Sequence, residues 1–342
     1  MTWYPLARKL LFATDPERAH QLTMEGLRLA HQLGASRAIC PPEGKKVQCM
    51  GLSFRNAVGL AAGVDKNADY FEALGALGFG FVEVGTVTPR PQPGNPKPRI
   101  FRLPAAEAMI NRLGFNNKGV DYLVQRVRNH RFNGVLGINI GKNFDTPIEH
   151  AVEDYLLCLD KVFPYADYVT VNISSPNTAD LRSLQLESAL GPLLARLSER
   201  RAALADEHER FVPIAVKVAP DLEPEAVKAI AEAVDEHGMD AVIATNTTVD
   251  RPGVNGMEHA DEPGGLSGKP LKTRSNEILK VFRQKLPDHI ALIGVGGITR
   301  GQDAADKLIA GANLVQFYTG MVYRGPELVG DCIKALSFGP VN

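Results

Sequence analysis

The sequence predicts an α/β fold, a (β/α)8 TIM barrel, with an N-terminal amphipathic helical hairpin in front of it. From residue 56 onward, short β-branched runs alternate with longer segments whose apolar residues have helical spacing. Eight such runs with crossover helices between them are typical of a parallel barrel. The expected strands are residues 57–63, 81–88, 134–141, 168–175, 212–219, 241–248, 290–298 and 314–320.

Residues 1–36 differ from the barrel and predict two short amphipathic helices, so we expect the domains 1–36 and 37–342. Leu6 and Leu10 share one helical stripe, Asp15 followed by proline is a start signal for the second helix, and Gly34 ends it. The pattern alone leaves two alternatives open. The hairpin packs across the barrel floor, or it lies at a membrane interface, where aromatic, leucine and basic residues are favoured together.

Segments with helical spacing follow most of the expected strands and often end at glycine, as "NADYFEALGALG" and "EPEAVKAIAEAVDEHG" do. Two insertions interrupt this alternation. Residues 89–118 are rich in proline, and residues 249–270 contain "GGLSG". Both follow strands, so we expect both on the catalytic face of the barrel, as lids or binding elements.

Composition excludes several classes of protein. The 342 residues carry a formal net charge of -1, with 44% apolar and 23% charged residues, which gives no general attraction to nucleic acid. The four cysteines form no C-x-x-C pair, so neither a disulfide framework nor a thiolate metal site is expected. We also expect no membrane-spanning helix and no secretory signal.

Polar residues at the carboxyl ends of the expected strands should converge on one site. Asn139 interrupts "GVLGINIG", Asn172 ends "YVTVN", and Lys217 lies within "IAVKVAP". Strand alternation points Asn139 and Lys217 into the barrel, opposite their apolar neighbours. A buried ammonium needs an accepting partner, so Lys217 indicates either an anionic ligand or an internal salt bridge.

Glycine clusters after the last two strands favour a phosphate site. "GVGGI" spans residues 294–298 and "QFYTG" spans residues 316–320, a region of the barrel that often binds phosphate. A phosphate site, an inward lysine and several asparagines suit flavin mononucleotide (FMN), whose reduced form is stabilised by a nearby positive charge. No strand-end motif contains a histidine or a carboxylate pair, so hydrolysis and a metal centre are not indicated.

The stretch "NISSPNT", residues 172–178, contains two candidate catalytic serines. Strand alternation places Ser174 on the same side as Asn172. Pro176, however, biases Ser175 toward an extended conformation and offers no N–H to a continuing ladder, so the alternation need not hold there. The residues alone leave both serines open.

Taken together, the motifs resemble class 2 dihydroorotate dehydrogenase, the quinone-linked enzyme of pyrimidine synthesis. The resemblance covers nearly the whole chain, including the amphipathic N-terminus. Its matching stretches are "GLAAGVDKN", "EVGTVTPRPQPGNPKPR", "NRLGFNN", "INIGKN", "NISSPNT", "IAVKVAPDL", "ATNTT", "GGLSGKPL", "GVGGI" and "VQFYTG".

The resemblance implies three groups of site residues. One FMN per chain would be bound by Ala62, Gly63, Val64, Asp65, Lys66, Thr86, Asn139, Asn172, Lys217, Thr245, Gly268, Gly297, Tyr318 and Thr319. Dihydroorotate would be bound by Lys66, Asn111, Arg112, Leu113, Gly114, Phe115, Asn172, Asn177, Asn246 and Thr247. The quinone path would be lined by His20, Arg102 and Tyr318.

The implied reaction oxidises (S)-dihydroorotate to orotate. Ser175 would remove a proton from C5, hydride would pass from C6 to the flavin, and a membrane quinone would reoxidise it. Serine is a poor base at its ordinary pKa, so substrate acidification or a relay through Thr178 and water would assist it. The resemblance further implies a peripheral protein, a monomer, on the cytoplasmic side of the cell inner membrane, attached through residues 1–36.

Two alternatives from other functional classes remain at this point. Lys217 could be the nucleophile of a Schiff-base aldolase, although that function leaves the hairpin and the paired asparagines unexplained. The chain could instead be a non-catalytic, flavin-binding, membrane-associated module in which Ser175 and Thr178 only shape a turn.

Overall fold

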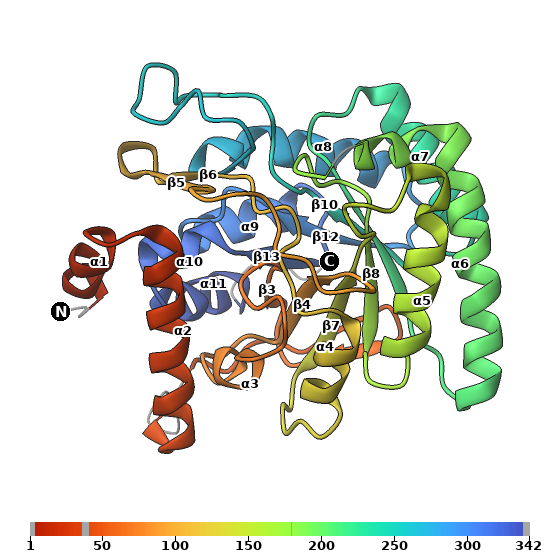
Figure 1. Cartoon of the computed structure of the whole chain (residues 1–342), viewed down its shortest axis with the longest axis horizontal. Helices are drawn as coiled ribbons and strands as arrows, with labels where there is room; N and C mark the ends of the chain where they lie inside the picture. The colour runs from red at the N-terminus through yellow and green to blue at the C-terminus, as the bar shows by residue number, and fades with distance from the viewer. Residues whose placement is uncertain (1–3, 36–40, 179, 338–342) are drawn as a thin grey trace.

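Eight parallel strands form a closed barrel in the computed structural model, which describes residues 4–35, 41–178 and 180–337 (Figure 1). Each lies within one of the eight expected runs, so the predicted TIM barrel is confirmed. The order around the barrel is β3 (Val58–Leu60), β4 (Phe81–Val87), β7 (Val135–Ile140), β8 (Tyr168–Asn172), β9 (Ile214–Val218), β10 (Ala241–Ala244), β12 (Ala291–Val295) and β13 (Leu314–Phe317). The expected domain boundary at residues 36 and 37 lies outside the described residues.

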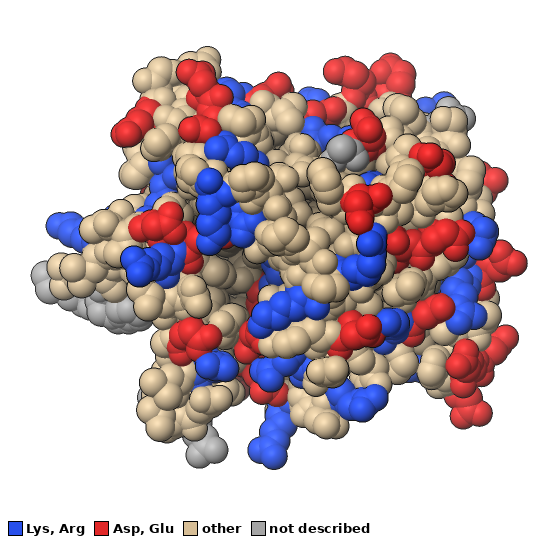
Figure 2. All heavy atoms as spheres, in the orientation of Figure 1, with Lys and Arg blue, Asp and Glu red and all other residues tan. Residues whose placement is uncertain are grey.

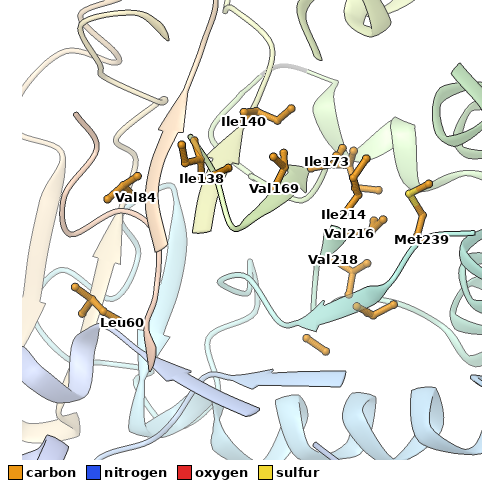
Figure 3. Packing of buried hydrophobic residues seen from close by; sticks show 14 of the residues in the cluster. Leu60, Val84, Ile138, Ile140, Val169, Ile173, Ile214, Val216, Val218 and Met239 are labelled. Atoms are coloured by element: carbon orange, nitrogen blue, oxygen red, sulfur yellow. The ribbon is translucent and has the colours of Figure 1, made fainter. Parts of the chain in front are cut away.

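Helices surround the barrel and bury the outward-facing side chains of its strands. Val84, Ile138, Val169 and Val216 are completely buried and lie in one continuous cluster between strands and helices (Figure 3). Strand alternation sends their neighbours into the barrel. The surrounding helices are α3 (Phe71–Gly75), α4 (Val120–Val127), α5 (Ala151–Val162), α6 (Glu187–His208), α7 (Pro224–Glu236), α8 (Lys272–Lys285), α9 (Gly301–Ile309), α10 (Thr319–Arg324) and α11 (Glu327–Ser337).

A small antiparallel sheet, which was not expected from the sequence, covers the barrel floor. It consists of β1 (Val47–Cys49) and β2 (Leu52–Phe54). Phe54 packs edge-on against Phe81, the first residue of β4, with ring centroids 5.2 Å apart. The floor is therefore closed by residues that follow the N-terminal hairpin, and the hairpin itself lies elsewhere.

The two insertions meet in a three-stranded antiparallel sheet. Its strands are β5 (Ile100–Leu103), β6 (Ala108–Asn111) and β11 (Gly265–Gly268), with β6 in the centre. Phe101, Ile110 and Leu266 belong to a separate small core under this sheet. The sequence indicated binding loops here but not their pairing, because antiparallel partners about 150 residues apart leave no local signal.

The N-terminal hairpin is confirmed as two helices, α1 (Tyr4–Phe12) and α2 (Pro16–Gln32), and the side chain of Asp15 caps α2 by accepting from the Arg18 amide at 3.0 Å. In Figure 1 the pair lies at the left edge of the barrel, and α1 contacts α10 while α2 contacts α3 and β5. The hairpin therefore borders the catalytic side of the barrel.

Charges of both signs are interspersed over the face in Figure 2. No large area of that face carries a single sign, which agrees with the near-zero net charge of the sequence. Among the described residues, no helix combines the length and apolar character required to cross a bilayer.

Candidate active site

A cavity opens at the carboxyl ends of the barrel strands. It brings together most of the residues expected to bind flavin or substrate. Those that line it are Ala62, Gly63, Lys66, Thr86, Asn111, Leu113, Gly114, Phe115, Asn172, Ser175, Asn177, Lys217, Thr245, Asn246, Thr247, Gly268, Gly297, Tyr318 and Thr319.

Four expected site residues lie outside this lining. The Arg112 side chain turns away to Glu262, 2.6 Å from it. Asp65 accepts the backbone N–H groups of residues 69 and 70, so it shapes the turn after β3. Asn139 lies in the barrel interior, where its Oδ1 accepts from the Thr86 hydroxyl at 2.6 Å. Val64 lines a second cavity, described below.

The two serines of "NISSPNT" have different environments. Ser174 is completely buried, and its hydroxyl donates to Oδ1 of Asn172 at 3.0 Å and accepts from Nδ2 of Asn246 at 3.0 Å. Ser175 lines the cavity, and its Oγ accepts a hydrogen bond from the backbone N–H of Asn177 at 3.2 Å. The chain has left the strand by Ser175, since β8 ends at Asn172. Only the second serine can therefore meet a ligand in the cavity.

The expected proton relay would need a connection between Ser175 and Thr178, and the two side chains are not directly hydrogen-bonded in the described part of the chain. Thr178 is buried but is not part of the cavity lining, and within the described residues no hydrogen bond joins it to Ser175. A link between the two hydroxyls would need a bridging water.

Two lysines bring positive charge to opposite parts of the cavity. Lys217 is buried at the end of β9, and in the described part of the chain no hydrogen bond involves its ammonium group. Burial lowers its pKa, and the negative charge of Glu83 opposes that effect. Lys66 donates to the Gly63 carbonyl at 3.1 Å, and burial lowers its pKa to about 8, with Arg99 adding to the effect. Both ammonium groups can donate hydrogen bonds to an anionic or carbonyl ligand. The desolvation cost of this binding is low because both groups are already largely removed from water.

Amide side chains converge on the cavity from several strands. Asn172 donates through Nδ2 to the Thr86 hydroxyl at 3.0 Å, and Asn177 donates through Nδ2 to Oδ1 of Asn111 at 3.3 Å. Asn246 completes this set from the end of β10. Each amide offers both a donor and an acceptor, which matches a planar ring whose edge alternates carbonyl and N–H groups.

Tightly packed glycines form one wall of the cavity. A Cβ on Gly297 would lie 2.3 Å from the Lys272 backbone, and one on Gly320 would lie 2.0 Å from the Ile298 carbonyl. Only glycine fits at these two positions, so the backbone itself lines the cavity there. The sequence did not single out Ser267, whose hydroxyl is 2.8 Å from that of Thr319 in the same wall.

A second cavity of about 390 Å³ lies between the N-terminal hairpin and the barrel. The lining is mostly apolar and includes all three residues expected on the quinone path, His20, Arg102 and Tyr318. Arg102 lies 4.5 Å from the centre of the Phe12 ring, and burial lowers the pKa of His20 to about 4, so its imidazole is neutral. Tyr318 lines both cavities and is the wall that they share.

In the described part of the chain, no three His, Cys, Asp or Glu side chains are grouped so that they could hold a metal ion. The three described cysteines are buried, and burial raises the pKa of Cys49 to about 12. The polar side chains that line the cavity include lysine, serine, threonine and amide groups.

Comparison with known proteins identifies the family. The family model for dihydroorotate dehydrogenase matches residues 45–338. The chain is 57% identical to a dihydroorotate dehydrogenase (quinone) of Herminiimonas arsenicoxydans, covering 97% of each chain, and 56% identical to one of Azotobacter vinelandii, covering 98% of this chain and 96% of the relative. The crystal structure of ligand-free DHODH from Eimeria tenella is similar with a TM-score of 0.84 and 39% identity, covering 94% of both chains. The chain belongs to the dihydroorotate dehydrogenase family.

Proposed function

We propose that the cavity at the barrel mouth binds FMN and dihydroorotate together, and that the cavity under the hairpin admits the quinone. The chain is a dihydroorotate dehydrogenase: it oxidises dihydroorotate to orotate, a step of pyrimidine synthesis, and passes the electrons to a quinone. The observation that carries the proposal is the position of Tyr318, which lines both cavities. A flavin against this wall would be accessible to one reactant from each side.

The cavity lining suits FMN. Lys217, without a hydrogen-bond partner among the described residues, would face the pyrimidine edge of the flavin, and the glycine wall at Gly268 and Gly297 would hold the phosphate. When bound here, FMN would supply an acceptor for the hydride from C6 of dihydroorotate and a donor of two electrons to the quinone. Asn139 and Asp65 would act from behind the lining, by holding Thr86 and the turn after β3.

Lys66 and the converging amides would hold the substrate. Lys66 would pair with the carboxylate of dihydroorotate, and Asn111, Asn172, Asn177 and Asn246 would read the amide edges of its ring. Leu113, Gly114, Phe115 and Thr247 would close the remaining sides, and Arg112 would contribute through its backbone alone, since its side chain is paired with Glu262.

Ser175 would take the proton from C5 of the substrate. Ser175 lines the cavity, and its Oγ accepts a hydrogen bond from the backbone N–H of Asn177, which holds the hydroxyl in place. Because the ordinary pKa of serine is far above neutral, proton removal would depend on the substrate becoming acidic as the hydride leaves, with water and Thr178 as a further route.

The N-terminal hairpin would hold the enzyme against a membrane. Leu6 is 70% exposed, Leu10 is 75% exposed and Leu33 is 76% exposed, an apolar surface that a bilayer interface would cover. We therefore propose a monomeric peripheral protein on the cytoplasmic side of the cell inner membrane. In this arrangement residues 1–36 form the membrane-association segment and residues 37–342 form the catalytic domain.

Anaerobic mixing with dihydroorotate tests the proposal. The flavin absorbance should bleach on mixing and return when a short-chain quinone is added, whereas fumarate should have no effect. Bleaching by dihydroorotate followed by reoxidation with fumarate alone would contradict the role of the second cavity. A purified protein whose flavin is not FMN would contradict the cofactor assignment, which mass spectrometry of the released flavin decides.

Two alternative functions were left open by the sequence. The family assignment does not support a Schiff-base aldolase or a flavin module without turnover. Borohydride treatment in the presence of substrate gives an independent check, because a Schiff base on Lys217 would be trapped as a covalent adduct. We expect none.

A further inference from the structure

A buried carboxylate lies beneath the cavity and has no part in the proposed reaction. Glu83, in the middle of β4, is completely buried inside the barrel. Its Oε1 accepts from Nδ2 of Asn139 at 2.8 Å. Its Oε2 accepts from the hydroxyl of Tyr168 at 2.9 Å, from Nε2 of Gln316 at 2.9 Å and from the hydroxyl of Thr170 at 3.2 Å. Sequence patterning did not indicate this group, because "FVEVGTVT" contains a single acidic residue in an apolar run.

A chain of hydrogen bonds leads from Glu83 to the cavity. Oδ1 of Asn139 accepts from the Thr86 hydroxyl at 2.6 Å, and the same hydroxyl oxygen accepts from Nδ2 of Asn172 at 3.0 Å. Oδ1 of Asn172 in turn accepts from the Ser174 hydroxyl at 3.0 Å. Thr86 and Asn172 line the cavity, so the chain connects the buried carboxylate with the ligand-binding surface.

The charge on Glu83 determines the direction of every bond in this chain. An ionised carboxylate can only accept hydrogen bonds, so Asn139 must present its Nδ2 to Glu83 and its Oδ1 to Thr86. The single hydroxyl proton of Thr86 then goes to Asn139, and its oxygen is left to accept from Asn172. If the side chain at position 83 could also donate, the amide groups of Asn139 and Asn172 could each rotate by about 180°. The donors and acceptors that face the cavity would then no longer have a single arrangement.

One further contact supports Glu83 as the accepting end of this chain. Gln316 gives its Nε2 to Glu83, although this orientation leaves its Oε1 without a hydrogen-bond partner among the described residues. Lys217 is buried in the same interior, at the end of β9. Of these two side chains, Lys217 lines the cavity and Glu83 does not.

We propose that Glu83 is a positioning residue of this active site, because its negative charge fixes the donor and acceptor directions of Asn139, Thr86 and Asn172 toward substrate and flavin. The inference rests on the proposed function, since it is the binding of orotate and flavin that the fixed directions would serve. Glu83 itself does not line the cavity.

Two substitutions of Glu83 separate the charge from the shape of the side chain. Glu83→Gln keeps the shape but can donate, whereas Glu83→Asp is shorter but still only accepts. We expect the Kd of orotate, measured on the holoenzyme from the shift of the flavin absorbance, to rise about tenfold in Glu83→Gln. It should rise less in Glu83→Asp. If Glu83 served only to fill space, the order would be reversed.

Tyr168→Phe is the matched control, because it removes one donor to Glu83 without changing the direction of the chain. Its Kd for orotate should stay within about twofold of the original, the effect of losing one of several bonds to a charged group. An orotate Kd for Glu83→Gln equal to that of the unmodified enzyme, or lower than that of Glu83→Asp, would overturn the inference.

Neutron diffraction on the unmodified enzyme tests the same point if Glu83→Gln does not fold. A deuterium on Glu83, or Oδ1 of Asn139 turned toward it, would overturn the inference, whereas an ionised Glu83 facing Nδ2 would support it. Failure of the proposed function would be distinct from either result, because the unmodified enzyme would then show no spectral shift with orotate at all.

Discussion

The two cavities of this protein share a wall at Tyr318 but are built in opposite ways. The cavity at the barrel mouth has a mixed lining that includes lysine and amide groups, with Asn172 and Lys217 at the ends of barrel strands and Asn111 at the end of β6. The cavity under the hairpin is mostly apolar, and the hairpin that covers it is fastened by side-chain bonds to backbone carbonyls, such as Arg102 to Thr14 at 3.0 Å and Arg8 to Tyr323 at 2.7 Å.

This difference fits the two reactants. Dihydroorotate is small, polar and charged, so recognising it needs donors and acceptors fixed by a rigid scaffold. A quinone is large and apolar, so it needs an apolar passage, and the two helices of the hairpin cover a cavity of that kind. The division predicts that changes in one cavity should affect one half-reaction and spare the other.

The largest expected effect comes from the serine at the barrel mouth. Ser175→Ala should slow flavin reduction by dihydroorotate about a hundredfold or more, because it removes the base that we propose, and should leave reoxidation by quinone unchanged. Ser174→Ala is the control, since Ser174 is buried against Asn172 and Asn246. Rapid-mixing absorbance measures both steps. The assignment of the base fails if the Ser174 change is the one that abolishes reduction.

The next effect should appear on the other side of Tyr318. Arg102→Met should raise the quinone concentration needed for half-maximal reoxidation about 10- to 100-fold, because a charged donor is lost from an apolar cavity. Arg8→Met is matched to it, since Arg8 also fastens the hairpin but does not line this cavity. Equal losses in both variants would mean that only the attachment of the hairpin matters.

The pH dependence of substrate binding tests the charge of the first cavity. The pKa of Lys66 is lowered from its ordinary value to about 8, so its ammonium loses its proton as the pH rises through that value. Because the substrate carboxylate needs the protonated form, its affinity should fall about tenfold between about pH 7 and pH 9. Titrations of the Ser175→Ala enzyme would measure binding without turnover. A flat profile would show that Lys66 is not the carboxylate partner.

The smallest effect on catalysis should come from the exposed surface of α1. Replacing Leu6 and Leu10 with serine should weaken binding to anionic lipid vesicles about fivefold, while turnover with a soluble quinone stays the same. Leu157→Ser is the control, because Leu157 is an exposed leucine on α5, on the outside of the barrel. Sedimentation with vesicles is the measurement. Unchanged sedimentation would place the membrane contact elsewhere.

The sequence predicted the barrel well because its signals are local. Each strand is a short apolar run, and polar residues such as Asn172 and Lys217 mark where the run reaches the site. The identity of the serine was harder to predict. Alternation favoured Ser174, and only the turn at Pro176 brings Ser175 into the cavity.

The features that the sequence missed depend on distant partners. The sheet of β5, β6 and β11 joins segments about 150 residues apart, and the orientation of Arg112 depends on Glu262 in the other insertion. Glu83 is a third example, since its role arises from donors on three other strands. Periodicity along the chain carries no information about such contacts.

Simultaneous binding of orotate and a quinone analogue tests the central claim most directly. If the two reactants occupy separate cavities on either side of Tyr318, the Kd of orotate should stay within about twofold when a short-chain, redox-inactive quinone analogue is saturating. An orotate Kd that rises in proportion to the analogue concentration would show that both compete for one cavity, and would contradict the account.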